Sequence, residues 1–167
     1  MMTESGDKKV NVKTIAQVSI VVKDLDKTIE TYWKTLGIGP WDVHYMQPPK
    51  TWGLTYHGKP AEFTMKVAFA MVGQVELEII EPTSGDNIYS DFLREKGEGV
   101  HHLLFLVDDV DATTKAMQTM GFALTQSGHQ NDGYWAYYDT ADALKVIWEV
   151  AQPPQDMPPD YSYPAES

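Results

Sequence analysis

Cysteine is absent from this 167-residue chain. Its absence excludes disulfide bonds, thiolate catalysis, zinc fingers and iron–sulfur clusters. Arginine is nearly absent, since Arg94 is the one residue of that type. Because arginine is the usual bidentate clamp for phosphate and carboxylate groups, a large polyanionic ligand would find few such anchors on this protein.

Basic charge and long hydrophobic runs are scarce as well. The chain carries 13 lysine and arginine residues against 24 aspartate and glutamate residues, so its formal net charge at pH 7 is -11. Nucleic-acid and anionic-membrane binders need a basic face, which this balance disfavours. No apolar run reaches the roughly 18 residues of a membrane span, and the N-terminus lacks a signal-peptide core. We therefore expect a cytoplasmic protein that binds neither nucleic acid nor membranes.

The middle of the chain contains an internal repeat. Residues 15–26 (IAQVSIVVKDLD) align with residues 100–111 (VHHLLFLVDDVD), which sets Gln17 against His102. Each segment is an apolar strand followed by a helix signal, and an aspartate stands at the expected N-cap of each helix. The sequence therefore predicts two related modules rather than one undivided fold.

Both halves continue alike, with about three further strands in each. They close on similar segments, EIIEP at 78–82 and EVAQP at 149–153. The first half is longer, and its surplus is expected within 40–61, a stretch rich in proline, glycine and aromatic residues. Because loops on a rigid scaffold commonly carry substrate selection, this stretch is expected to help choose the ligand.

The chain is predicted to form one structural domain with two tails. The expected boundaries are a flexible N-terminal segment at 1–12, a first module at 13–82, a linking helix within 83–99, a second module at 100–151 and a proline-rich tail at 152–167. We expect both ends to be disordered. The alternative is that Tyr161 and Tyr163 dock the tail onto the body or onto a second subunit.

Four polar residues occupy equivalent places in the two halves. Strand alternation points Gln17 and His102 away from the helix that follows each strand, toward the concave side of the sheet, and turns His101 to the helix side. Glu78 and Glu149 lie within apolar strands, where a buried carboxylate without a partner is costly. Singly, such residues are more often satisfied or solvent-facing. Together they suggest one shared divalent metal with nitrogen and oxygen ligands.

These segments resemble the vicinal oxygen chelate superfamily, which includes glyoxalase I, methylmalonyl-CoA epimerase, extradiol dioxygenases and bleomycin-resistance proteins. The resemblance covers about 14–152 and is carried by IAQVSIVVKDLDKTIETYW, VELEIIEP, GEGVHHLLFLVDDVD and VIWEV, of which the middle two are most similar to the epimerase branch. It implies an α+β fold in which paired βαβββ modules form a cup-shaped mixed sheet with helices on the convex side. It also implies metal ligands at Gln17, Glu78, His102 and Glu149, the first of which is usually histidine in the epimerases.

The resemblance further implies chemistry at one divalent metal ion per site, and the oxygen-rich ligand set suits Mn, Co, Mg, Fe, Ni or Zn. The expected activity is that of a metal-dependent lyase or isomerase, including epimerases. Such an enzyme chelates two substrate oxygens, removes a proton beside a carbonyl and stabilises the enolate. Glu149 or Glu78 is expected to be the base, with Glu76 as a weaker candidate. The alternatives are a bleomycin-resistance type protein that binds a small aromatic or antibiotic molecule, and a ring-cleaving oxygenase.

The expected partners are a small-molecule substrate and a second copy of the chain in a homodimer. CoA and glutathione conjugates, the ligands of the best-known enzyme branches, are anionic, and this chain could grip them only through a local group of lysines: Lys34, Lys50, Lys59 and Lys66. The aromatic residues favour an apolar pocket for a smaller metabolite instead. The residues predicted to bind substrate are Trp41, His44, Tyr45, Trp52, Tyr56, Tyr134 and Trp135.

Overall fold

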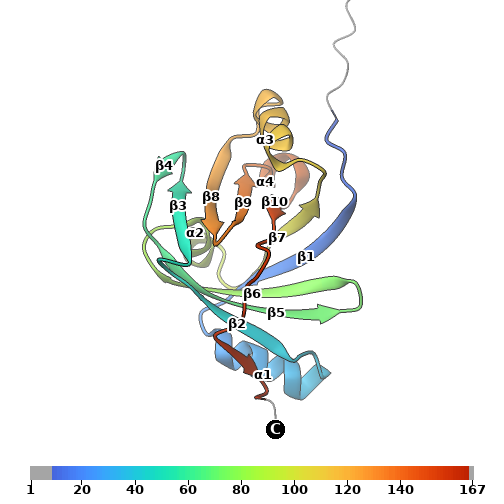
Figure 1. Ribbon diagram of the computed structural model, residues 1–167, viewed down its shortest axis with the longest axis vertical. Helices are drawn as coiled ribbons and strands as arrows, with labels where there is room; N and C mark the ends of the chain where they lie inside the picture. Colours follow the sequence, from blue (N-terminus) through green and yellow to red (C-terminus); the bar gives the residue numbers. More distant parts are fainter. Residues whose placement is uncertain (1–8, 166–167) are drawn as a thin grey trace, which may run out of the picture.

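The structure is a computed structural model that describes residues 9–165, and these residues form one mixed sheet of 11 strands curved into an open cup (Figure 1). The first half of the chain forms β1 (Thr14–Val21), α1 (Leu25–Leu36), β2 (Trp41–Met46), β3 (Thr51–Tyr56), β4 (Lys59–Pro60), β5 (Thr64–Val72) and β6 (Val75–Ser84). The second half forms α2 (Ile88–Glu95), β7 (Gly99–Leu106), α3 (Val110–Thr119), β8 (Leu124–Gln130), β9 (Gly133–Tyr138), α4 (Ala141–Leu144), β10 (Ile147–Gln152) and β11 (Tyr161–Tyr163).

The strand order confirms the paired modules. It is β11-β2-β5-β6-β1-β7-β10-β9-β8-β3-β4, so each half contributes four neighbouring strands and the halves meet where β1 runs antiparallel to β7. In the first half β1 is parallel to β6, and in the second β7 is parallel to β10. The α+β fold with two βαβββ modules is therefore as predicted, with extra strands at both edges of the sheet.

The register of the strands follows the repeat residue by residue. In the first half Ser19 pairs with Glu78, and in the second half Leu104 pairs with Glu149. Ser19 and Leu104 are equivalent positions, each two residues beyond the first ligand candidate of its half. The two glutamates therefore occupy corresponding places on either side of the central strand pair.

The caps of the main helices form where the sequence predicts them. The Asp24 carboxylate accepts a hydrogen bond from the backbone N–H of Lys27 at the start of α1, and Asp109 accepts one from Ala112 at the start of α3. α1 ends at Gly37, whose φ of 65° lies in the left-handed region that glycine tolerates best. The two aspartate caps satisfy backbone N–H groups at the helix starts, and the N–H of Gly37 donates to carbonyl groups of the last turn of α1.

α1 and α3 cover the convex face of the cup, one for each half. Leu25 and Ile29 of α1 pack into the same buried cluster as Trp41 of the first half-sheet. Met117 of α3 packs against Trp148 of the second. α2 differs from both, because it packs into the cluster that faces the inside of the cup. Among residues 9–165, no helix is both long and apolar enough to cross a membrane.

The surplus of the first half is a hairpin rather than an irregular loop. β3 pairs with β4 and, antiparallel, with β8, so residues of the first half extend the outer edge of the second half-sheet. Thr51 pairs with Gln130 and Thr55 with Ser127. The hairpin therefore joins the two halves at a place distant from the central β1–β7 pair (Figure 1).

The C-terminal segment is docked on the body, in contrast to the disorder expected there. Residues 153–160, here called the strap, lead from β10 of the second half to β11, which pairs with β2 of the first half (Figure 1). Tyr161 pairs with Val43 and donates a hydrogen bond to the Asp26 carboxylate. The expectation of a flexible start falls largely on residues 1–8, which, like 166–167, lie outside the described residues.

Candidate functional site

Three buried side chains meet at the centre of the sheet. Glu78, His102 and Glu149 come from β6, β7 and β10, and each offers a ligand atom within 4.8 Å of the others. Nε2 of His102 lies 2.9 Å from Oε2 of Glu149 and 3.4 Å from Oε2 of Glu78. Strand alternation predicted His102 on the concave face, and strand register brings the two glutamates to it from segments far apart in the chain.

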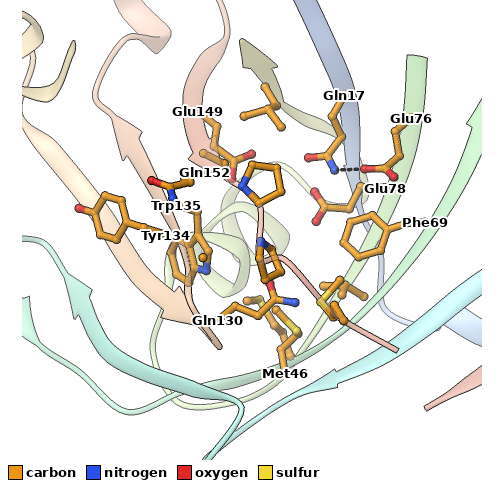
Figure 2. Close-up of a pocket in the computed structure, with 18 of the residues that line it drawn as sticks. Gln17, Met46, Phe69, Glu76, Glu78, Gln130, Tyr134, Trp135, Glu149 and Gln152 are labelled. Carbon is orange, nitrogen blue, oxygen red and sulfur yellow. Dashed lines mark hydrogen bonds between the residues drawn. The ribbon is translucent and has the colours of Figure 1, made fainter. Parts of the chain in front are cut away.

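Gln17 lies beside this group, on the central strand β1. Its Nε2 donates a hydrogen bond of 2.7 Å to Oε1 of Glu76, while its Oε1 lies 3.4 Å from the hydroxyl of Ser19. Glu76 thus engages the amide nitrogen, which leaves the amide oxygen as the end able to face a cation. Figure 2 shows Gln17, Glu76, Glu78 and Glu149 along one side of the cavity.

Ser19 is a site residue that the sequence reasoning did not single out. Its hydroxyl donates a 2.5 Å hydrogen bond to Oε2 of Glu78, and the side chain is completely buried. Strand alternation was the available signal, because it places Ser19 on the same face as Gln17. The bond holds the Glu78 carboxylate in one orientation.

His101 is a second neighbour of the site. β7 carries one extra residue relative to β1 here, a β-bulge, and both histidine side chains are buried. Nδ1 of His101 lies 2.8 Å from Nδ1 of His102, and its ring packs edge-on against Phe92 of α2. Engagement of Nδ1 leaves Nε2 of His102 directed at the two glutamates.

The charges at this centre are unbalanced. Burial alone would lower the pKa of His102, but the carboxylates of Glu149 and Glu78 outweigh burial and raise the pKa to about 9. Burial raises the pKa of Glu149, an effect that His102 opposes. Burial also raises the pKa of Glu76, although Gln17 donates a hydrogen bond to it. Two carboxylates thus contact one imidazole and a third, Glu76, lies nearby on β6, an excess of acidic groups that a bound cation would balance.

The residues fit a divalent metal ion. Oε2 of Glu149 accepts no hydrogen bond of acceptable geometry from the described part of the chain, although His102 lies close to it. A buried carboxylate oxygen without a hydrogen bond is costly, which favours a cation as its partner. One imidazole nitrogen with carboxylate oxygens is a donor set that first-row divalent ions accept.

A cavity of about 300 Å³ opens beside the carboxylates. Its walls come from both half-sheets and are mostly apolar (Figure 2). The apolar and aromatic lining consists of Met46, Met65, Val67, Phe69, Tyr89, Leu104, Tyr134, Trp135, Tyr137 and Ala151, together with Pro153, Pro154 and Met157 of the strap. A small molecule in this cavity would contact the carboxylates on one side and apolar walls on the others.

Residues 16–138 match the model of the Glyoxalase/Bleomycin resistance protein/Dioxygenase superfamily. The chain belongs to this superfamily. The predicted family, named above for its vicinal oxygen chelate chemistry, is thereby confirmed. A relative at 39% identity over 99 residues is the uncharacterized protein YqjC of Bacillus subtilis (strain 168), and the match covers 58% of this chain and 71% of that protein.

Solved structures of methylmalonyl-CoA epimerases share the fold of this superfamily member. The enzyme from Mycobacterium tuberculosis has a TM-score of 0.62 at 22% identity, with 86% of this chain and 89% of that chain covered. An epimerase in complex with methylmalonyl-CoA and NH4+ has a TM-score of 0.63 at 23% identity, with 89% and 100% covered. A hypothetical protein from Bacillus halodurans C-125 has a TM-score of 0.61 at 17% identity, with 86% and 96% covered.

Of the aromatic residues predicted to bind substrate, Tyr134 and Trp135 line the cavity of this superfamily member. The odd-numbered residues of β2 point to the convex face instead. Trp41 is fully buried there, with its ring 5.7 Å from that of Tyr32 in α1. Tyr45 is exposed and packs against Tyr161 of the docked tail. Alternation within β2 therefore removes both residues from the cavity.

The other predicted aromatic residues also lie outside the cavity lining. His44 is buried beside Phe69 without reaching the cavity. Trp52 is 53% exposed and stacks on His129 at a centroid distance of 3.9 Å. Tyr56 donates a 2.5 Å hydrogen bond to a carboxylate of α2. The extra hairpin uses its aromatic side chains mainly for packing.

The lysines considered as an anion-binding group are largely committed to ion pairs. Three of the four pair with carboxylates, and the pairs are Lys34–Glu30, Lys50–Asp160 and Lys66–Asp26. No lysine or arginine lines the cavity formed by the described residues.

Tyr137, which is not among the residues predicted to bind substrate, also lines the cavity and reaches the centre. Its hydroxyl lies 2.8 Å from that of Tyr89 and 3.5 Å from Nε2 of His102. Burial raises the pKa of Tyr137 well above its ordinary value, so the side chain is a neutral hydrogen-bond donor. The strand pattern of residues 133–139 offered a signal, because Trp135 and Tyr137 must share a face.

Proposed function

We propose that this protein is a metal-dependent lyase or isomerase that removes a proton beside a carbonyl group. The observation that carries the proposal is the convergence of Glu78, His102 and Glu149 on one point at the side of an apolar cavity. Gln17, equivalent to His102 in the repeat, is the fourth ligand in this proposal. A divalent ion bound there would polarise the substrate carbonyl and stabilise negative charge on its oxygen.

In this proposal Glu149 is the general base. Its Oε2 forms an ion pair with Nε2 of His102 at 2.9 Å, whereas the Ser19 hydroxyl holds Glu78 in place. The Glu149 carboxylate takes the proton from the carbon beside the carbonyl, and the C–H electron pair moves into the carbonyl group to give an enolate. Return of a proton to that carbon restores the carbonyl compound, so the hydrogen is exchanged and the configuration can invert.

The surroundings of the centre support this assignment. His102 and Ser19 are completely buried, so both side chains are shielded from bulk solvent. The solved epimerases that share the fold are named for the inversion of a carbon beside a thioester carbonyl, a reaction of the proposed class. At 22–23% identity, these structures support only the fold of this protein. We infer its reaction class from the carboxylates and the imidazole at the centre of the sheet.

Metal analysis and proton exchange test the proposal together. The protein is loaded with Zn²⁺ or Mn²⁺, dialysed and analysed by mass spectrometry, beside the Glu78→Ala variant. We expect one ion per chain in the wild type and loss of it in the variant. Exchange is followed by proton NMR in D2O with α-hydroxyacetophenone, whose hydrogens beside the carbonyl should be replaced by deuterium.

The outcomes separate the three functions. A wild-type protein that retains no divalent ion overturns the proposal. If it also binds a small aromatic ligand tightly, the result supports a protein of the bleomycin-resistance type. Oxygen uptake with bound iron supports a ring-cleaving oxygenase instead.

A further inference from the structure

Two buried hydrogen-bond donors face the cavity without partners. The side chains of Gln130 and Trp135 are each 7% exposed, and both line the cavity. Neither Nε2 of Gln130 nor Nε1 of Trp135 has a hydrogen-bond partner within the described residues. Buried donors are normally satisfied, so these two are suited to an acceptor that a ligand brings.

The donors and the carboxylates occupy different parts of the cavity. Figure 2 shows Gln17, Glu76 and Glu78 on one side and Gln130 near Met46 on the other, with Trp135 on the wall between Gln130 and Glu149. Gln130 is the last residue of β8, at the edge where the extra hairpin attaches through Thr51. A ligand that reaches the metal centre with one end can therefore present its other end to the donors.

The rest of the cavity offers nothing to an anionic group. Its charged lining residues are the carboxylates Glu76, Glu78 and Glu149, and no lysine or arginine reaches it from the described chain. Near the strap, Lys50 is held 2.7 Å from the carboxylate of Asp160. An anionic handle, such as the phosphates of a CoA ester, would meet uncompensated negative charge.

The strap roofs the cavity. Pro153, Pro154 and Met157 of the strap line it. Hydrogen bonds tie the strap to the β8–β9 turn, where the N–H of Gln155 donates to Asp132 at 3.1 Å. In Figure 1 the strap crosses from β10 to β2 in front of the sheet. A long substituent would have to leave the cavity past this segment.

We infer that the substrate is a compact, uncharged carbonyl compound whose apolar body carries a hydrogen-bond acceptor at the end remote from the metal-chelating oxygens. Gln130 and Trp135 receive that acceptor and determine specificity. The inference rests on the proposed function, since it assumes that the reacting end of the substrate lies at Glu78, His102 and Glu149. It departs from the CoA ester named in the epimerase complex that shares the fold.

The test compares two uncharged probes of nearly equal shape. Both are α-hydroxyacetophenones, one with a para-acetyl group and the other with a para-isopropyl group, which has no oxygen. Calorimetric titration of the Zn²⁺-loaded protein should show the acetyl probe binding about tenfold more tightly, the gain expected for a buried donor that acquires its acceptor. Equal affinities, or a preference for the isopropyl probe, would overturn the inference.

Variants assign the preference to the two donors. Gln130→Met removes the amide donors with little change of side-chain length, and Trp135→Phe removes the indole N–H together with part of the ring. Each should reduce the ratio of acetyl to isopropyl affinity, measured with both probes on the same variant so that a general loss of packing cancels. Gln152→Met is the matched control, because Gln152 lines the cavity but is exposed. A control that loses the preference as fully as Gln130→Met would contradict the assignment.

Propionyl-CoA completes the experiment. We expect no competition between it and the acetyl probe, and displacement of the probe by propionyl-CoA would overturn the proposed substrate class. Zinc retention and deuterium exchange are measured on the same samples. If zinc is retained and exchange occurs but the acetyl preference is absent, the substrate inference fails and the proposed function stands. If zinc is not retained, the proposed function itself fails.

Discussion

The two halves of the cup share a backbone plan but carry different side chains at equivalent places. In the first half Gln17 and Glu76 hydrogen-bond to each other, and Ser19 holds Glu78. In the second half the corresponding pair is Leu104 and Glu149, so the glutamate there has an apolar neighbour on β7 in place of a hydroxyl group.

This difference suggests a division of labour. The first half fixes its polar groups by mutual hydrogen bonds, which suits residues that position an ion. In the second half Oε2 of Glu149 has an ion pair with His102 at 2.9 Å in place of a hydroxyl hydrogen bond such as the one that holds Glu78, which suits a group that must take up a proton. The repeat places Glu78 and Glu149 at equivalent positions. The different residues beside them, Ser19 and Leu104, give the two carboxylates different surroundings.

The largest expected effect is a difference in deuterium exchange between variants of the two glutamates, Glu149 and Glu78. Glu149→Gln should lower deuterium exchange of α-hydroxyacetophenone by about 10²- to 10⁴-fold, the usual contribution of a general base, while probe binding stays measurable. Glu78→Gln is the matched change in the other half and should lower exchange less. Equal losses in the two variants, measured by NMR on zinc-loaded protein, would remove the distinction between the halves.

The next effect tests Gln17 as a ligand. Gln17→His makes the first position identical to its partner His102, and it should raise zinc affinity because imidazole is a stronger zinc ligand than an amide oxygen. Gln17→Met removes the oxygen and should lower zinc affinity by at least the roughly 10–100-fold that loss of a supporting residue costs. Competition with a chromogenic chelator measures both. Unchanged affinity in both variants would exclude Gln17 from the site.

A smaller effect tests the serine of the first half against the leucine of the second. Ser19→Ala removes the hydrogen bond that orients Glu78 and should lower zinc affinity by about 10–100-fold. Leu104→Ala should leave zinc affinity nearly unchanged but cost about 2–5 kcal/mol of unfolding free energy, as large-to-small core substitutions do. Chelator competition and urea denaturation separate these outcomes, and a zinc defect in the leucine variant alone would contradict them.

The smallest expected effect is the loss of stability when a helix N-cap is removed, and it should be equal in the two halves. Asp24 caps α1 through Lys27 and Asp109 caps α3 through Ala112, at 3.0 and 2.8 Å. Replacing either aspartate by alanine should cost about 1 kcal/mol of unfolding free energy in urea denaturation. Asparagine at either position should retain most of the stability. A cost confined to one half would show that the caps are not equivalent.

Much of the fold was predictable because the same βαβββ pattern occurs in both halves of the sequence. The alignment of Gln17 with His102 fixes a register, and that register brings Glu78 and Glu149 to equivalent places. The caps were predictable for a local reason, since an N-cap needs only a residue that accepts a hydrogen bond from the next turn.

The cavity walls were less predictable, because they depend on long-range placement. Trp41 and Tyr45 lie on the convex face, and strand parity in β2 cannot be fixed until its neighbours are known. The bulge at His101 changes which side chains are buried together. The homodimer remains a prediction from the resemblance.

We propose that the four repeat-related positions, Gln17, Glu78, His102 and Glu149, hold one divalent cation. The most direct test is a crystal structure of the zinc-loaded protein with anomalous data collected at the zinc edge. We expect one strong peak inside the cup, about 2.0–2.2 Å from oxygens of Gln17, Glu78 and Glu149 and from Nε2 of His102. A cup without a peak, or a peak bound by other residues, would contradict it.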